Sequence, residues 1–141
     1  MDNEIQQLVE SFHEFMKSFH QKSYYKLKDK QIYPGQPKLL SVIKDNEGIP
    51  QKELTKKMCV KPATITGMLA KLEANGYVYR KVDDSDKRMM RVYLTPEGHK
   101  LAEEAMAFID EFTRELFSDF SEDEVKIMRH LINKMVSNLK T

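Results

Sequence analysis

Several features are scarce in this chain of 141 residues, and each scarcity excludes a class of protein. Cys59 is the one cysteine, so the chain cannot form a disulfide within itself, which fits a reducing compartment. No stretch approaches the roughly 18 consecutive apolar residues that a membrane-spanning helix needs. The N-terminal run MDNEIQQLVESFHEF is acidic and amphipathic, and it lacks the basic start and apolar centre of a secretory signal. We therefore expect a cytoplasmic protein that forms one globular domain.

The patterns of catalysis and of metal binding are missing as well. The sequence contains no nucleophile elbow and no glycine-rich phosphate loop. The four histidines are scattered along the chain: His13, His20, His99 and His130. They form no pair at i, i+4, and no cysteine lies close to them, so the spacing of a metal site is absent. We predict a protein that is not an enzyme and has no cofactor and no metal site.

The net charge of +1 hides an uneven distribution along the chain. Residues 1–50 carry 7 basic and 7 acidic side chains, residues 51–94 carry 10 and 5, and residues 95–141 carry 6 and 10. A chain that is nearly neutral overall can still present a basic face to phosphates. The middle third is therefore the segment to search for a nucleic-acid contact.

Apolar spacing predicts helices on both sides of one short hairpin. The predicted helices cover residues 4–25, 39 to about 48, 51–58, 62–75, 96 to about 117, and 122 to the end. The predicted strands cover residues 77–82 and 89–94, which are rich in β-branched and aromatic side chains. The fold class is thus mainly α with a small β-hairpin wing (α+β). A pair of short helices followed by a hairpin is typical of a winged helix-turn-helix, although a general α+β bundle with an incidental hairpin has the same element order.

The helix over residues 62–75 has an outer face that suits the major groove of DNA. Ile65, Leu69 and Leu72 are expected to face inward. The outer face then carries small, polar or basic residues: Ala63, Thr64, Thr66, Gly67 and Lys71. Small side chains allow a helix to approach base edges, and threonine or lysine can contact bases or phosphates. A solvated helix face has a similar composition, so this pattern alone leaves both interpretations open.

Lys61 occupies the expected N-cap of this helix, directly before Pro62. Lysine cannot accept a hydrogen bond from the first backbone N–H groups, and its charge adds to the positive end of the helix dipole. A bound phosphate would explain the unusual residue, because a helix N-terminus beside a lysine attracts anions. The alternative is a poor cap that the fold tolerates.

The predicted hairpin has a charged tip that includes Asp86, Lys87 and Arg88. A carboxylate two residues from an arginine can restrain the many rotamers of the longer side chain. An arginine held in this way can enter the minor groove, where the potential is most negative. The alternative is an ordinary charged turn, but the position directly after a helix-turn-helix favours DNA contact.

These segments resemble the MarR family of bacterial and archaeal transcription regulators. The resemblance rests on the runs QKELTKKM, KPATITGMLAKLEANGYV, DDSDKR and VYLTPEG, and it covers about residues 35–100. It implies that residues 62–75 are the recognition helix and that Asp86 and Arg88 are the aspartate–arginine pair of the wing. Thr95 and Gly98 match the motif that follows the wing. Two positions depart from the family pattern: Gly67 stands where many members have arginine, and Asp84 stands where a proline is frequent.

The resemblance also implies one MarR-type domain over residues 1–141 and a homodimer. Residues 1–33 and 96–141 would be dimerisation helices around a winged helix-turn-helix lobe at 34–95, with the helix-turn-helix at about 51–75 and the wing at about 77–94. Independently, apolar residues such as Phe12, Phe15, Met16 and Phe19 exceed what one small core can bury, which indicates a partner surface. A second broad stripe follows nearer the C-terminus: Phe108, Ile109, Phe112, Leu116, Phe117 and Phe120. A two-fold dimer would bind an inverted-repeat operator in double-stranded DNA.

Family members commonly release DNA when a small aromatic compound binds between the dimer helices and the DNA-binding lobe. The residues that suit such a pocket here are His13, Met16, His20, Tyr24, Tyr25 and Tyr33, although a methionine and aromatic stripe is also typical of a plain core. Cys59 is expected to be a small buried apolar residue rather than an oxidation sensor. The sequence therefore predicts a sequence-specific DNA-binding repressor that a small effector relieves. The alternative is a winged-helix module that binds another protein and no DNA.

Overall fold

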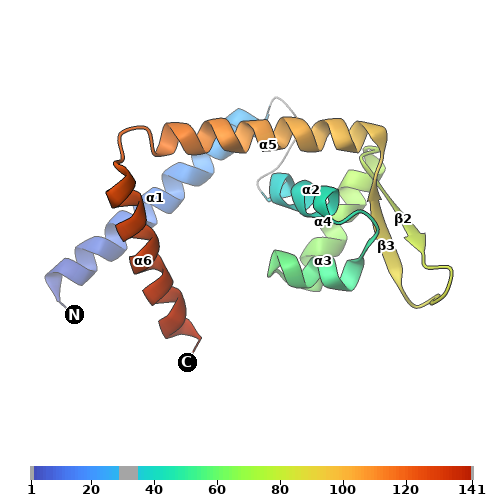
Figure 1. Cartoon of the computed structure of the whole chain (residues 1–141), viewed down its shortest axis with the longest axis horizontal. Coiled ribbons are helices and arrows are strands. Elements are labelled where there is room, and N and C mark those ends of the chain that lie inside the picture. The colour runs from blue at the N-terminus through green and yellow to red at the C-terminus, as the bar shows by residue number, and fades with distance from the viewer. Residues whose placement is uncertain (1, 29–34, 141) are drawn as a thin grey trace. The chain divides into compact units, whose positions relative to one another are not determined.

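Helices dominate the structure, a computed structural model that describes residues 2–28 and 35–140. The elements are α1 (Asn3–Lys28), α2 (Gln36–Asp45), β1 (Ile49–Pro50), α3 (Gln51–Met58), α4 (Pro62–Ala74), β2 (Val78–Val82), β3 (Met90–Leu94), α5 (Pro96–Leu116) and α6 (Glu122–Leu139). The predicted fold class, mainly α with a small β-hairpin wing, is confirmed (Figure 1). The chain divides into two compact units, residues 1–106 and residues 107–141.

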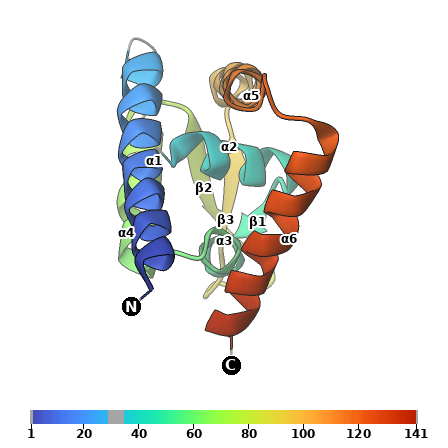
Figure 2. The ribbon, with the colours of Figure 1, turned by 90° about the vertical axis from the view of Figure 1, so that its left-hand side faces the viewer.

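The segment from α2 to β3 forms a winged lobe (residues 36–94) inside the first unit. α2 contacts α3 and β3, α3 contacts α4, and α4 contacts β2. Figure 1 shows α2, α3 and α4 on one side of the hairpin, and Figure 2, viewed from the helix side, places the strands behind α2 and α3. The three short helices therefore support one side of a hairpin whose tip extends past them.

The core of the winged lobe is made of aliphatic side chains from every one of its longer elements. Its largest fully buried members are Leu39, Leu40, Ile43, Leu54, Ile65, Leu69, Leu72, Val78 and Val92. Burying one such side chain stabilises a fold by about 1.5–3 kcal/mol. The predicted inward positions of α4, Ile65, Leu69 and Leu72, are confirmed, and this burial turns the remaining residues of α4 outward.

The sheet has three antiparallel strands in the order β1–β3–β2. In the hairpin, Val78 pairs with Leu94 and Val82 pairs with Met90. The short strand β1 was not predicted, and it joins the sheet through the pair Ile49 and Val92. This strand connects the start of α3 directly to the hairpin.

The joint between the wing and α5 is tightly bonded. Thr95 caps α5 as predicted, since its Oγ1 accepts a hydrogen bond from the Gly98 N–H at 3.0 Å. The same hydroxyl donates to the Gly76 carbonyl at 2.6 Å, and the Thr95 N–H donates to the Tyr77 carbonyl at 3.0 Å. Gly76 has φ +78°, the left-handed conformation that ends α4 and turns the chain into β2. The first turn of α5 is therefore fastened to the base of the hairpin.

Both terminal helices carry apolar side chains that the single chain leaves exposed. On α1 these are Ile5, Leu8, Val9, Phe12, Phe15 and Met16. α6 has no buried residue, and it exposes Val125, Ile127, Met128, Leu131, Ile132, Met135, Val136 and Leu139. Of the predicted stripe nearer the C-terminus, Phe112 is buried, Phe108, Leu116 and Phe117 are half-buried, and Ile109 and Phe120 are exposed. Within the described residues, none of the helices combines the length and the apolar character needed to cross a membrane.

The predicted capping box at the start of α6 is confirmed. Ser121 Oγ accepts from the Glu124 N–H at 3.1 Å, and Glu124 Oε2 accepts from the Ser121 N–H at 2.8 Å. The hydrogen bond from the Ser121 backbone stabilises the carboxylate, which lowers the pKa of Glu124.

Candidate nucleic-acid interface

The N-terminus of α4 has no side-chain cap. Lys61 is the N-cap residue in an extended conformation, its side chain makes no capping hydrogen bond, and no acidic residue lies in the first turn. Pro62 occupies the first turn, where its missing N–H costs nothing. Lys61 and Pro62 are both exposed. The positive end of this helix and the lysine charge are therefore open to an external anion.

The outer face of α4 carries the residues that the sequence assigned to DNA contact. Ala63, Thr64, Thr66, Gly67 and Lys71 are all exposed. At Gly67 a Cβ atom would meet no heavy atom within 4 Å. The N-terminal half of the outer face of α4 therefore carries small side chains, which allow a helix to enter a DNA groove.

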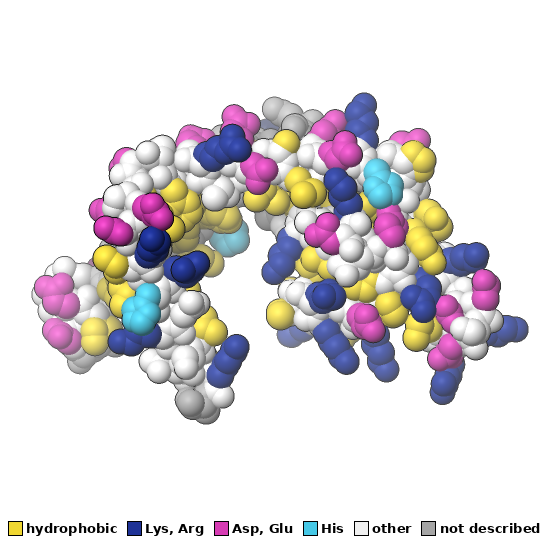
Figure 3. Space-filling model, viewed as in Figure 1, with side chains coloured by type: hydrophobic (Ala, Val, Ile, Leu, Met, Phe, Trp, Pro, Cys, Tyr) yellow, Lys and Arg dark blue, Asp and Glu magenta, His cyan; other side chains and the backbone are white. Residues whose placement is uncertain are grey.

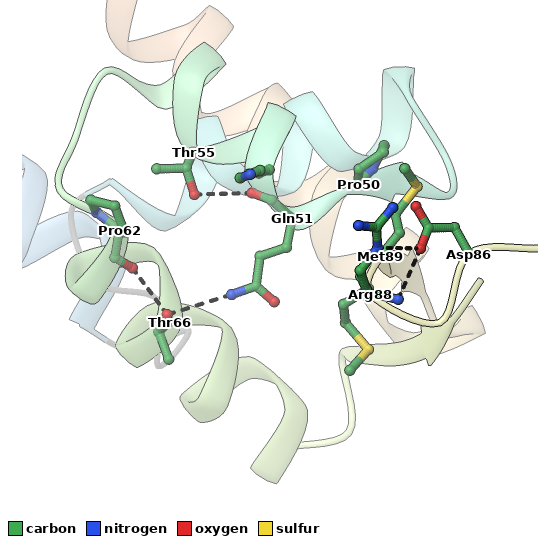
Figure 4. Close-up of a pocket in the computed structure, with 10 residues that line it drawn as sticks. Pro50, Gln51, Thr55, Pro62, Thr66, Asp86, Arg88 and Met89 are labelled. Carbon is green, nitrogen blue, oxygen red and sulfur yellow. Dashed lines mark hydrogen bonds and ion pairs between the residues drawn. The ribbon is translucent and has the colours of Figure 1, made fainter.

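The hydroxyl of Thr66 is already engaged within the protein, which the sequence did not indicate. It donates to the Pro62 carbonyl at 3.0 Å and accepts from Gln51 Nε2 at 3.4 Å. Figure 4 shows Gln51 extending from α3 toward Thr66 on α4. Thr66 thus offers chiefly its methyl group to a partner, while Gln51 links the two helices of the helix-turn-helix.

The wing (β2, β3 and the loop 83–89) presents Arg88 at its tip. Asp86 Oδ1 accepts from the Arg88 backbone N–H at 3.1 Å and from Arg88 Nε at 3.2 Å. The predicted restraint of an arginine by a carboxylate two residues away is therefore present (Figure 4). The Arg88 side chain remains 92% exposed, and Lys87 beside it is exposed too. The wing tip offers two cations, one of which is oriented.

A groove of about 670 Å³ lies between α3, α4 and the wing tip. Arg88 and Asp86 line it from the wing and Thr66 lines it from α4, so two parts of the predicted site meet here. α3 adds Gln51, Lys52 and other residues that the sequence analysis did not assign. Figure 3 shows Lys and Arg side chains along the lower edge of the winged lobe, over α3. The sequence could have indicated that α3 contacts DNA, because this helix of 8 residues contains three lysines, all of which are exposed: Lys52, Lys56 and Lys57.

Asp83 and Arg91, at the base of the wing loop, were also missed. Arg91 Nε donates to Asp83 Oδ1 at 2.7 Å, and Arg91 Nη1 donates to the Gly48 carbonyl at 2.8 Å. The hydrogen bond from Arg91 is the largest cause that holds the pKa of Asp83 well below its usual value, and the same pairing raises the pKa of Arg91. The two side chains therefore remain ionised together across the physiological range.

Of the described residues that were predicted to bind an effector, Tyr24 and Tyr25 share one depression. Tyr24 and Tyr25 line a shallow depression on α1 together with Ser18, Gln21 and Lys22. His13, Met16 and His20 lie on the same helix and are exposed, but they do not line this depression. Tyr33 lies outside the described residues.

The prediction that Cys59 is buried is wrong. Cys59 is exposed, and it ends α3 in the left-handed conformation with φ 54°. The turn into α4 directs its side chain outward, where Sγ donates to the Lys56 carbonyl at 3.5 Å. Met58, one residue earlier, is the side chain that enters the core.

Comparison with known proteins gives consistent matches over most of the chain. The model of the MarR family matches residues 32–90. The transcriptional regulator HosA of Escherichia coli is 31% identical over 130 residues, which cover 90% of this chain and 95% of HosA. The uncharacterized HTH-type transcriptional regulator YsmB of Bacillus subtilis is 30% identical over 88 residues. The aligned residues cover 62% of this chain and 60% of YsmB. Among solved structures, the S. aureus MepR–DNA complex superposes with a TM-score of 0.86 at 29% identity, covering 94% of this chain and 97% of MepR.

Proposed function

Because the chain belongs to the MarR family of transcription regulators, we propose that it is a sequence-specific DNA-binding protein, and that it acts as a homodimeric repressor in the cytoplasm. One observation carries the proposal: the uncapped, lysine-flanked start of α4 and the oriented Arg88 of the wing belong to the same winged lobe. We propose that residues 1–141 act as a single MarR-type domain, with residues 34–95 as the DNA-binding lobe.

In this proposal α4 enters the major groove with its N-terminal half. Ala63, Thr64 and Gly67 approach the base edges, since no bulky side chain lies on that face. Lys61 binds a phosphate at the positive end of the α4 dipole. Further along α4, Lys71 adds a phosphate contact. Gly67 offers no hydrogen bond to a base, so contacts at other positions must supply base preference.

The wing then lies over the neighbouring minor groove. Arg88 inserts its guanidinium there, where the narrow groove concentrates negative potential. Lys87 and the lysines of α3 contact the sugar–phosphate backbone on either side. Backbone contacts position a protein on DNA without selecting its sequence, so they increase affinity and its salt dependence.

Dimerisation is proposed from the apolar surface of the terminal helices. The described parts of α1 and α6 each expose a run of large apolar side chains, and an apolar surface of that extent marks an interface in a folded protein. A second copy of the chain is the proposed partner. A two-fold dimer presents two recognition helices to half-sites about 34 Å apart, which requires an inverted-repeat operator.

Relief of repression by a small aromatic effector is the finer part of the proposal. The supporting observation is that Tyr24 and Tyr25 flank an open depression on α1. A partner chain would have to close this depression to make an enclosed pocket. The proposed pocket also includes His13, Met16 and His20 of the same helix, and Tyr33.

DNA binding is tested by titrating a labelled fragment that spans the protein's own promoter. We expect the wild type to bind with steep salt dependence and Arg88→Ala to weaken binding by at least about tenfold. Arg114→Ala is the matched control, because it removes one exposed arginine from the end of α5, which is not part of the winged lobe (residues 36–94), and should bind as the wild type does. Absence of wild-type binding even at low salt would refute the regulator proposal and favour a protein–protein module.

Dimerisation is tested by sedimentation with two α6 variants that each add one carboxylate. Leu131→Glu charges an apolar position and should give a monomer, while Asn133→Glu charges a polar position of the same helix and should leave the dimer intact. Because both side chains are exposed in the single chain, neither change should disturb the fold of a protomer. A wild type that sediments as a stable 16.6 kDa monomer at micromolar concentration would refute the dimer.

A further inference from the structure

Asp83 bonds to more groups than any other acidic side chain of the wing loop. Its Oδ2 accepts from the Ser85 N–H at 3.2 Å, from the Ser85 hydroxyl at 2.7 Å and from the Asp86 N–H at 2.9 Å. Its Oδ1 accepts from Arg91 Nε at 2.7 Å. One carboxylate therefore fixes the first half of the loop and also connects it to β3.

Arg91 extends this connection out of the hairpin. The same guanidinium donates to the Gly48 carbonyl, and the Gly48 N–H donates to the Val92 carbonyl at 3.0 Å. Gly48 lies directly before β1, which leads into α3. The Asp83 side chain is only 15% exposed and that of Arg91 35%, so solvent competes weakly for the pair. The loop of the wing is thus tied to the helix-turn-helix and not to the hairpin alone.

The connection continues from Asp83 to the arginine at the tip. Asp83 holds the backbone N–H of Asp86, and the Asp86 carboxylate in turn holds the backbone and the Nε of Arg88. The Asp86 carbonyl also accepts from the Met89 N–H at 2.9 Å, which closes the turn that carries Arg88. Among the described residues, Asp86 is the hydrogen-bond and ion-pair partner of the Arg88 side chain. The direction of Arg88 therefore depends on where Asp83 places Asp86.

We propose that Asp83 is a positioning residue for DNA recognition, which holds the wing loop in the conformation where Asp86 orients Arg88. The inference rests on the proposed function, because it requires that Arg88 contacts DNA. It assigns the first aspartate of the loop a task distinct from that of Asp86: Asp86 contacts the arginine, and Asp83 fixes the frame that holds Asp86.

The competing view treats Asp83 as one more negative charge near the DNA backbone. On that view its removal would strengthen binding, because it would reduce repulsion from phosphates. Positioning predicts the opposite sign. The chain provides a matched control in Asp84, which is adjacent and exposed and whose side chain makes no hydrogen bond or ion pair with the described residues.

The test compares Asp83→Asn with Asp84→Asn on the promoter fragment, since each variant removes one negative charge from the wing. We expect Asp84→Asn to bind as tightly as the wild type or up to about threefold tighter. We expect Asp83→Asn to bind about tenfold more weakly, as the loss of an oriented arginine contact implies. Circular dichroism and thermal unfolding establish that the variants are folded.

A double-mutant cycle separates positioning from general support of the fold. If Asp83 acts through Arg88, then Asp83→Asn should not weaken binding further in an Arg88→Ala background. If Asp83→Asn does not fold, the same cycle is run with Arg91→Lys. That change keeps the positive charge but removes the fork that spans from Asp83 to the Gly48 carbonyl.

The outcomes distinguish the two proposals. Wild-type protein that fails to bind the fragment overturns the proposed function and this inference with it. Wild-type binding with Asp83→Asn equal to or tighter than Asp84→Asn overturns the inference alone. An Asp83→Asn effect as large in the Arg88→Ala background as in the wild type shows fold support only, which also overturns it.

Discussion

Gly98→Ala should destabilise the protein, although alanine is normally the better helix former. Gly98 lies in the first turn of α5, and a Cβ atom there would stand 1.9 Å from the Tyr77 carbonyl oxygen and 2.9 Å from its carbon. A carbon–oxygen contact needs about 3.3 Å, so α5 and the start of β2 must separate by more than an ångström. The motif that begins at Thr95 therefore requires glycine for close approach of two backbone segments.

The magnitude follows from the bonds that this separation breaks. Thr95 donates to the carbonyls of Gly76 and Tyr77, and each of these hydrogen bonds contributes about 1 kcal/mol. Overpacking adds about 1–3 kcal/mol of strain. Alanine recovers about 1 kcal/mol of helix propensity, so the net loss is about 2–4 kcal/mol. For a chain of this length such a loss lowers the Tm by roughly 10 °C.

The matched control is Gly67→Ala, which places the same substitution in a helix where a Cβ meets nothing within 4 Å. It should stabilise the protein by up to about 1 kcal/mol. Thermal unfolding at one fixed protein concentration measures both variants, because coupled association would otherwise shift the Tm. A Gly98→Ala protein that melts with or above the wild type would refute the close-approach reasoning.

Three further predictions concern single positions. Lys61→Ser should raise the free energy of unfolding by about 1 kcal/mol, because serine supplies an N-cap. It should also weaken DNA binding severalfold and reduce the slope of log affinity against log salt concentration by about 1. If stability and DNA affinity both rose, Lys61 would not bind a phosphate. Ser121→Ala should cost about 1 kcal/mol in urea unfolding near neutral pH. Because the pKa of Glu124 is depressed from its usual 4.5, its stabilising contribution is complete above that pH and is lost as the pH falls through the folded-state value. The difference between wild type and Ser121→Ala should therefore narrow in acid, and a constant difference would contradict the capping box. Cys59→Gly should stabilise by about 1 kcal/mol in thermal unfolding, because φ 54° is strained for a residue with a Cβ; an unchanged or lower Tm would contradict it.

Helices and the hairpin were predictable because their signals are local. The spacing of Ile65, Leu69 and Leu72 defines the inner face of α4, and the capping box defines the start of α6 to the residue. The strand β1 has only two residues, too few for any pattern, and it exists because the Gly48 and Ile49 backbone lies against β3. A contact between segments more than 40 residues apart in sequence leaves no periodic signal.

The same distinction separates the correct and the missed site residues. Asp86 and Arg88 are two positions apart, so their contact was predictable from spacing alone. Arg91 reaches Gly48 across 43 residues, and its function as a link could not be inferred without the fold. Cys59 was assigned to the core from its apolar neighbours, but a single left-handed residue decided which side chain faced inward.

Lys61 shows when a broken local rule is informative. A sequence that places lysine at an N-cap can have its defect repaired by the fold, through an acidic side chain in the first turn or a neighbouring acceptor. Gly98 is a residue of another kind: a glycine in the first turn of a helix is unusual, but its close approach to the Tyr77 carbonyl, within the same chain, explains it. At Lys61 no cap and no first-turn acid is supplied, and the residue stays exposed. The lysine charge and the positive end of the helix dipole therefore face an external anion, which makes the start of α4 stronger support for a DNA contact than the composition of its outer face.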